Sequence, residues 1–251
     1  MGMESYSHNL KIKKDGKTLP SELPLNIISG ESHAEGGESM VSTIKARNAS
    51  TEKEVDIVLK ENKRESFATD EEMQESKKFY EFLKNFPGFG KFVPDTLYFK
   101  ARDTREDTPK AFCIQKFAKG ERIDRLNDDA IYKDPVVVRQ LLELAEASIK
   151  LLQTVRKEDT HYPDFMRTPE LNKLRVMFGA TIFNPRYSSN IIIADKPDKN
   201  GQQVFFVDVG VNANARMHKG WEWNRRHAVG SVVKLQFNAW KKKLEEILAK
   251  Q

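Results

Sequence analysis

Four polar residues of this chain stand beside apolar runs, at positions where their side chains could bind a ligand. Lys60 ends one apolar run, and Glu75 lies in the polar stretch that follows it. Asn190 directly precedes three isoleucines, and Asp208 directly follows a run of valine and phenylalanine. An asparagine and an aspartate at the two ends of one β-hairpin offer oxygen ligands to the same point, and Mg²⁺ binds such oxygens together with phosphates. The pattern predicts a magnesium site at Asn190 and Asp208, with Lys60 directed into a cleft and Glu75 as its ion-pair partner.

The elements that position these residues are predicted from hydrophobic patterning and turn residues. In the first half, β-rich runs separated by glycine or polar turns predict an antiparallel meander, and two further strands flank a charged loop. The predicted strands cover residues 25–29, 40–46, 55–60, 96–101 and 111–117. Before the fourth strand, an apolar stripe predicts a helix that begins near Asp70 and ends at Pro87-Gly88.

The second half of the chain is predicted to be mainly helical, because its apolar residues recur at helical spacing. Thr168-Pro169 and Gly179 are typical of the start and the end of a helix. The predicted elements are helices over residues 135–156, 168–179 and 221 to the end, and a hairpin of strands 191–194 and 204–207. The expected fold is therefore α+β, with a small sheet domain followed by a mainly helical one.

The order of these elements and their motifs resemble the protein-kinase-like superfamily, including its aminoglycoside- and choline-kinase-type branch, over roughly residues 25–210. The glycines between the first two strands stand where that superfamily has its glycine-rich loop. The strand that ends in Lys60 resembles V-A-I-K, and Asp208-Val209-Gly210 resembles D-F-G. The resemblance implies a bilobal fold, with an antiparallel sheet and one helix in the first lobe and a reduced, mainly helical second lobe. It also implies ATP and Mg²⁺ as cofactors.

The resemblance assigns roles to individual residues. Lys60 would contact the phosphates while pairing with Glu75, and Glu71 or Glu72 could equally be that partner. Lys60, Asn190 and Asp208 would be catalytic, and of these Asn190 and Asp208 would hold the metal ion. The nucleotide-binding residues would be Gly30, Gly36, Gly37, Lys60, Glu75, Gln115, Lys116 and Phe117, the last three along the adenine edge.

One position departs from the pattern of the superfamily. Its catalytic aspartate lies five residues before the asparagine, and here that position is Pro185, which cannot accept the substrate proton. The protein then either binds nucleotide without efficient phosphoryl transfer, as pseudokinases do, or uses a base from elsewhere. Asp159, His161 and Asp164 are candidates for that base, and Arg186 could contact phosphate.

The sequence therefore predicts an ATP- and Mg²⁺-binding kinase-like protein that is an atypical phosphotransferase, or else a pseudokinase that acts as a protein-interaction module. Its further partner would be an unidentified protein or small-molecule acceptor. The predicted organisation is a flexible arm over residues 1–20, a sheet lobe over 21–120 and a helical lobe over 121–251. The second lobe is expected to be truncated, because 43 residues follow Asp208.

Composition and charge exclude other classes of protein. The 251 residues are 39% hydrophobic, which is enough for a core, and their formal net charge is +5. The C-terminal residues 214–251 are basic, but their lysines fit the solvated face of an amphipathic helix better than a nucleic-acid interface. The single Cys113 excludes a disulfide framework, and no apolar run approaches the ~18 residues of a membrane span. We expect a soluble, cytoplasmic protein.

Overall fold

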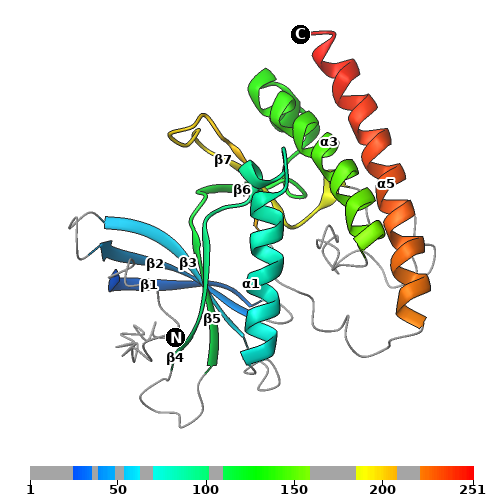
Figure 1. Ribbon diagram of the computed structural model, residues 1–251. Coiled ribbons are helices and arrows are strands. Elements are labelled where there is room, and N and C mark those ends of the chain that lie inside the picture. The colour runs from blue at the N-terminus through cyan, green and yellow to red at the C-terminus, as the bar shows by residue number, and fades with distance from the viewer. Residues whose placement is uncertain are drawn as a thin grey trace. The chain divides into compact units, whose positions relative to one another are not determined.

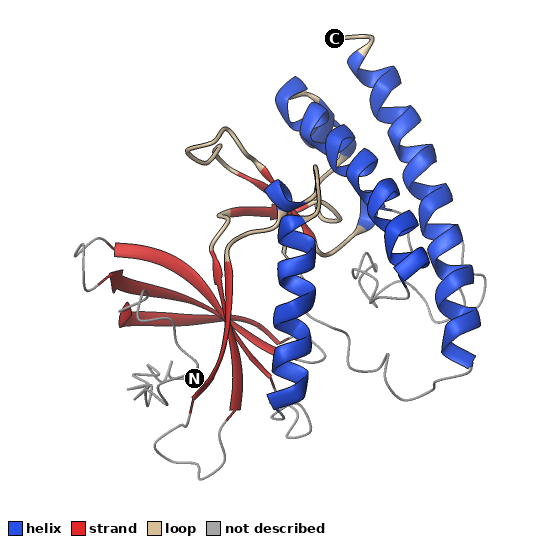
Figure 2. Ribbon diagram, in the orientation of Figure 1, coloured by secondary structure: helices blue, strands red, loops and turns tan. Residues whose placement is uncertain are grey.

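The computed structural model describes residues 25–35, 39–48, 54–62, 70–101, 110–158, 185–207 and 221–251. The chain divides into two compact units, the first within residues 1–78 and 95–117 and the second within 79–94 and 118–251. The first unit is built on a sheet, and most of the described helix lies in the second (Figure 2). The predicted α+β class with antiparallel sheets is confirmed. In the described stretches, no helix combines the length and apolar character needed to cross a bilayer.

The first unit contains a five-stranded antiparallel sheet in the order β1-β2-β3-β5-β4 (Figure 1). Three of its strands, β2, β3 and β4, each contain three β-branched or aromatic residues, which fit the pleated surface of a sheet. The strands are β1 (Leu25–Glu35), β2 (Ser39–Asn48), β3 (Glu54–Asn62), β4 (Thr96–Ala101) and β5 (Lys110–Lys116). The predicted meander and the pair of strands after it are therefore confirmed.

Strand β3 lies between β2 and β5, in the middle of the sheet. The side chain of Ile57 is buried and packs against Leu59 and Ile114, and Ile114 is the β5 partner of Leu59. Because side chains alternate along a strand, Val58 and Lys60 lie on the opposite face of the sheet. The apolar pattern of β3 thus assigns Lys60 to the face away from this small cluster.

Helix α1 (Asp70–Asn85) ends just before Pro87-Gly88, as predicted. Gly88 has a φ of 79°, a conformation that residues with a Cβ rarely adopt. Residues 79–94 belong to the second unit, and the 3₁₀ turn η2 (Gly90–Phe92) follows the helix. The buried apolar residues of this stretch are Phe79, Leu83, Phe89, Phe92 and Val93.

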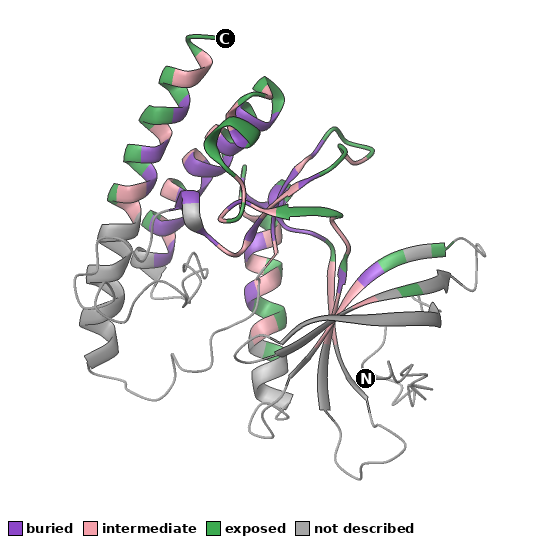
Figure 3. Ribbon diagram, turned by 180° about the vertical axis from the view of Figure 1, so that it is seen from behind, coloured by how far each residue is buried: buried purple, intermediate pink, exposed green. Residues whose placement is uncertain are grey.

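The core of the second unit lies between α3 (Pro135–Glu158) and α5 (Trp221–Leu248), which pack side by side (Figure 1). Helix α3 begins after Asp134, whose carboxylate accepts a hydrogen bond from the amide of Val136 at 2.8 Å. Buried positions form purple bands along both helices (Figure 3). They include Leu141, Leu144, Leu151, Phe237, Trp240 and Leu244. Full burial of one such leucine or phenylalanine contributes about 1.5–3 kcal/mol.

A three-stranded antiparallel sheet, in the order β6-β7-β8, completes the second unit. The hairpin of β7 (Ile191–Ala194) and β8 (Val204–Phe206) confirms the prediction, whereas β6 (Gly120–Arg122) was not predicted. Two short elements were also missed, α2 (Asp128–Tyr132) and the 3₁₀ turn η3 (Pro185–Tyr187). The hairpin and η3 carry the residues that the sequence analysis assigns to a catalytic loop.

The structure corrects the predicted end of the first strand and does not describe one predicted helix. Strand β1 does not end at residue 29, because Gly30 is paired with Ile44 on β2 and the strand continues to Glu35. The predicted helix over residues 168–179 falls outside the described residues.

Candidate functional site

Lys60 lies within β3, opposite Val41 on β2 and Cys113 on β5. The sequence predicts Lys60 at the end of its strand, but β3 continues to Asn62. Lys60 is half-buried. Val58 is the cross-strand partner of Gln115, so Lys60 and Gln115 share one face of the sheet. The structure thus brings together, on one sheet face, two of the residues predicted to bind nucleotide.

The other residues predicted on the first unit are only partly described. Glu75 lies on α1, but its side chain and those of Glu71 and Glu72 are outside the described part, so the ion pair with Lys60 stays a prediction. Gly36 and Gly37 also lie outside the described residues. Gly30 stands in mid-strand, as described above.

Residues 115–117 form the end of β5 and the start of the segment after it. Gln115 is 2% exposed, and its side-chain amide donates to the hydroxyl of Thr96 at 3.1 Å. The amide of Lys116 donates to the carbonyl of Asp95 at 2.9 Å, and that of Phe117 to the carbonyl of Asp56 at 3.4 Å. These two amides are therefore used in backbone hydrogen bonds along the sheet.

Asn190 lies in the second unit, at the end of the β7–β8 hairpin opposite the connecting turn. Its carbonyl accepts a hydrogen bond from the amide of Val207 at 2.8 Å, which extends the ladder of the hairpin by one pair. Its own amide donates to the hydroxyl of Ser188 at 3.2 Å, and its side-chain oxygen accepts from the hydroxyl of Ser189 at 3.3 Å. Asp208 follows Val207 in the sequence and lies outside the described residues. The backbone of Asn190 is thus fixed on both sides.

Pro185 occupies the position of the missing base and is buried. Its carbonyl accepts a hydrogen bond from the amide of Ser188 at 3.1 Å, so the residue serves the backbone of a turn. The candidates for a replacement base, Asp159, His161 and Asp164, fall outside the described residues.

The suggestion that Arg186 contacts phosphate is wrong, because its guanidinium is used by the protein itself. The residue is 7% exposed. Its Nε donates to the carboxylate of Asp128 at 2.8 Å, Nη1 to the carbonyl of Ile123 at 2.6 Å, and Nη2 to the carbonyl of Leu126 at 2.5 Å. Sequence analysis could not detect this role, since its partners are 58 to 63 residues away along the chain.

Asp128 connects Arg186 to the last helix. Its second carboxylate oxygen accepts from the ammonium of Lys243 at 2.9 Å, and that ammonium also lies 4.9 Å from the ring centre of Tyr132. The hydrogen bond from Lys243 is the largest influence on Asp128 and lowers its carboxyl pKa, burial opposes it, and Arg186 adds to the lowering. The bond to Asp128 correspondingly raises the pKa of Lys243. Both groups are therefore charged at neutral pH.

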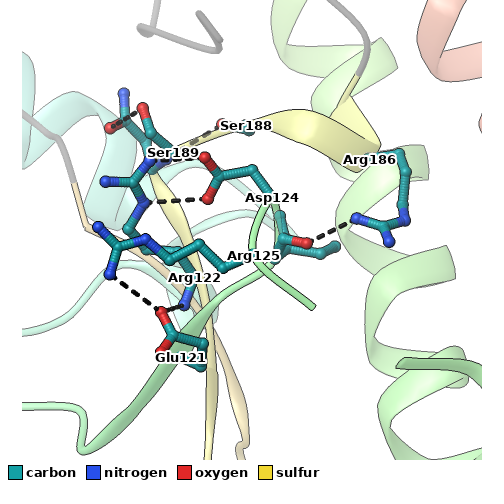
Figure 4. A network of polar contacts seen from close by, with 9 residues as sticks. Glu121, Arg122, Asp124, Arg125, Arg186, Ser188 and Ser189 are labelled. Carbon is teal, nitrogen blue, oxygen red and sulfur yellow. Dashed lines mark hydrogen bonds and ion pairs between the residues drawn. The ribbon is translucent and has the colours of Figure 1, made fainter. Parts of the chain in front are cut away.

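A second charged group lies on β6 and the turn after it. The guanidinium of Arg122 makes two hydrogen bonds to Asp124, at 3.0 and 2.5 Å, and Arg125 pairs with Glu121 at 3.6 Å (Figure 4). The amide of Ile123 donates to the carbonyl of Ile191 at 2.9 Å, so this turn runs beside the start of β7. Across the described residues, no group of three histidine, cysteine or acidic side chains could hold a metal ion.

Protein kinases are among the solved structures that resemble this chain. Rad53 residues 1–466, solved with AMP-PNP, matches at a TM-score of 0.39 with 15% identity, over 85% of this chain and 45% of that one. The ROP18 kinase domain, solved with AMP-PNP and sucrose, matches at 0.36 with 16% identity, over 75% and 52%. The MAP kinase LmaMPK10 from Leishmania major matches at 0.37 with 9% identity, over 86% and 56%.

The chain spans about half the length of these three kinase structures. No protein-family model matches the sequence, and no curated protein matches it. The likeness to protein kinases is therefore a distant one and concerns the fold.

Proposed function

We propose that the chain is an ATP- and Mg²⁺-binding kinase-like protein that acts as an atypical phosphotransferase with a degenerate catalytic loop. The backbone pairing of Asn190 with Val207 is the observation that carries the proposal. It fixes Asn190 at the end of the hairpin beside the residue that directly precedes Asp208 in the sequence. Two oxygen-bearing side chains at this place fit a hard cation, which prefers carboxylate and amide oxygens.

The proposed roles follow from the chemistry of each side chain. Asn190 and Asp208 hold Mg²⁺, which when bound neutralises charge on the phosphates. Lys60 supplies a positive charge to the same phosphates, and its location in a central strand limits the movement of its backbone. Gln115, on the same sheet face as Lys60, borders the segment proposed for the adenine edge.

Pro185 determines how fast such a protein would transfer a phosphoryl group. Phosphoryl transfer depends mainly on positioning and on electrostatic stabilisation, which the lysine and the metal ligands provide. A general base typically contributes 10²–10⁴-fold, and proline contributes none of it. We therefore expect turnover slower than that of a kinase with an intact loop by a factor of this order.

Thermal unfolding with and without ATP and Mg²⁺ tests the proposal. A ligand present at 100 times its dissociation constant stabilises the folded chain by about 2.7 kcal/mol, which raises the melting temperature. Asp208→Ala and Asn190→Ala should abolish the part of this rise that depends on Mg²⁺. Asn200→Ala is the matched control, since Asn200 is exposed in the turn at the other end of the hairpin. If ATP and Mg²⁺ leave the melting temperature of the unchanged chain where it was, the proposal is wrong.

The burial of Pro185 in a backbone turn favours a second function, that of a pseudokinase acting by protein contact. Turnover of radiolabelled ATP separates the two functions. Slow turnover that Asp208→Ala abolishes would support the phosphotransferase. Binding of ATP with no turnover above that of Asp208→Ala would support the pseudokinase.

A further inference from the structure

An arginine holds the segment that leads into Asn190. We call residues 185–190 the asparagine loop. Within it, Arg186 donates one hydrogen bond from each of its three guanidinium nitrogens, to Asp128 and to the carbonyls of Ile123 and Leu126. All three acceptors lie within residues 123–128, which run from the end of β6 to the first residue of α2. The planar fork of arginine, with donors in fixed directions, matches this set of acceptors in a way that a lysine ammonium cannot.

These bonds limit the freedom of the asparagine loop at its beginning. Its end is held where the amide of Val207 donates to the carbonyl of Asn190. Between the two fixed points, the amide of Ser188 donates to the carbonyl of Pro185 and the hydroxyl of Ser188 accepts from the amide of Asn190. The orientation of Asn190 therefore depends on the three residues between it and Arg186, which anchors the start of the loop to residues 123–128.

The Arg186 contacts are strong enough to decide the conformation of so short a loop. Hydrogen bonds that involve a charged group are about twice as strong as neutral ones, and Arg186 makes all three from a buried side chain. The carboxylate of Asp128 supplies the opposite charge that a buried guanidinium needs. Removal of the fork would leave two backbone carbonyls without this donor and release the start of the loop.

We propose that Arg186 is a positioning residue for the metal ligand Asn190: its contacts with Asp128, Ile123 and Leu126 hold the asparagine loop in the conformation that lets Asn190 bind Mg²⁺. The inference rests on the proposed function, because it concerns the same metal site. Groups that orient metal ligands typically contribute 10–100-fold to metal affinity. Arg186 would thus act on the metal-dependent part of nucleotide binding and leave the metal-free part unchanged.

The test compares dissociation constants for ATP measured with excess Mg²⁺ and with EDTA, and uses their ratio as the readout. Arg186→Lys keeps the charge and loses the fork, and we expect it to reduce the Mg²⁺-dependent gain in affinity about tenfold while the affinity in EDTA stays the same. Arg125→Lys is the matched control, because Arg125 lies in the same segment with an exposed side chain and pairs with Glu121. It should leave the ratio unchanged.

A double-mutant cycle separates positioning from a general loss of stability. In the background of Asn190→Ala, which has already lost the ligand, Arg186→Lys should cause no further change in the ratio. Equal losses of affinity with and without Mg²⁺, or the same loss in the Asn190→Ala background, would overturn the inference. If Arg186→Lys is unfolded at the assay temperature, Asp128→Asn removes the charge on one acceptor and gives the same test with a smaller expected loss.

The two proposals fail in different ways. If the unchanged chain shows no Mg²⁺-dependent gain in ATP affinity, the proposed function is wrong and the inference falls with it. If the unchanged chain shows the gain and a folded Arg186→Lys variant keeps it in full, the inference alone is wrong.

Discussion

Gln140 on α3 offers the sharpest test of how the helical core supports the β7–β8 hairpin. Its side-chain oxygen accepts two backbone hydrogen bonds, from the amide of Gln203 at 2.8 Å and from that of Val204 at 3.0 Å. Its side-chain nitrogen donates to the carbonyl of Gly201 at 2.7 Å. Gln140 is 9% exposed, so one buried amide group supports the turn and the first residue of β8. Replacement of Gln140 by methionine preserves the length of the side chain and removes all three bonds.

The expected cost follows from how far each backbone group is buried. Val204 is fully buried, so its amide would lose its partner without access to water, at about 1–3 kcal/mol. Gln203 is half-buried and Gly201 is exposed, so water can replace most of what these two groups lose. Together the losses predict that Gln140→Met lowers the free energy of unfolding by about 2–4 kcal/mol. Gln140→Glu keeps the acceptor and loses the donor, and we expect about half that effect.

Urea unfolding followed by the fluorescence of the buried Trp240 would measure these free energies, with m-values compared to confirm that each variant unfolds in the same way. Arg139→Met is the control, because Arg139 is the exposed neighbour on the same helix and surface changes usually stay within about 0.5 kcal/mol. Amide hydrogen exchange should show faster exchange at Val204 in Gln140→Met. A Gln140→Met variant no less stable than Arg139→Met would refute the assignment of these hydrogen bonds.

Two further predictions concern the same unit. Gly120→Ala should lower the melting temperature much more than Gly201→Ala. An added Cβ at Gly120 would lie 2.1 Å from the carbonyl oxygen of Ile193, whereas at Gly201 there is open space and only the strain of its φ of 77°. Differential scanning calorimetry of both variants checks this, and equal melting temperatures would contradict the close approach of β6 to β7. Asp128→Asn should cost about 1 kcal/mol at pH 7, since the carboxylate is half-exposed. The pKa of Asp128 is lowered by Lys243 and Arg186, so this contribution is complete above about pH 4 and is lost as the pH falls through the lowered pKa. In urea titrations from pH 7 to pH 3, the free energies of unfolding of the unchanged chain and of Asp128→Asn should converge. A constant difference between them would contradict the ion pairs.

The larger elements could be predicted from local sequence because each carries its own periodic signal. Alternating apolar residues identify β2 to β5, and the i, i+3, i+4 spacing identifies α3 to within two residues. Strand β6, helix α2 and turn η3 have only three to five residues, too few for a period to show. Gly30 illustrates a different error. A glycine after an apolar run predicts the start of a loop, but the pairing with β2 extends β1 through Gly30.

Residues of the candidate site could be predicted only where a polar residue directly adjoins an apolar run that forms a strand. Asn190 was found because it precedes three isoleucines that form β7. Arg186 and Gln140 carry no such signal, because their partners are about 60 residues away and the bonds exist only after the unit has folded. The positive charge of Arg186 in a loop predicts phosphate binding. Its side chain is instead buried and donates to three acceptors within the protein, so that prediction is wrong.

The loop around Pro185 is better suited to holding a ligand than to moving a proton. Proline fixes its own φ and has no amide hydrogen, which suits the first position of a helical turn and stiffens the loop that Arg186 also restrains. A carboxylate at this buried position would cost several kcal/mol unless it found a partner, and burial would raise its pKa. A substitution of Pro185 by aspartate would therefore give up a stiff turn for a base that is partly protonated. Because proton transfer is not expected at this position, the Mg²⁺-dependent affinity for ATP is the quantity that tests the proposed function first.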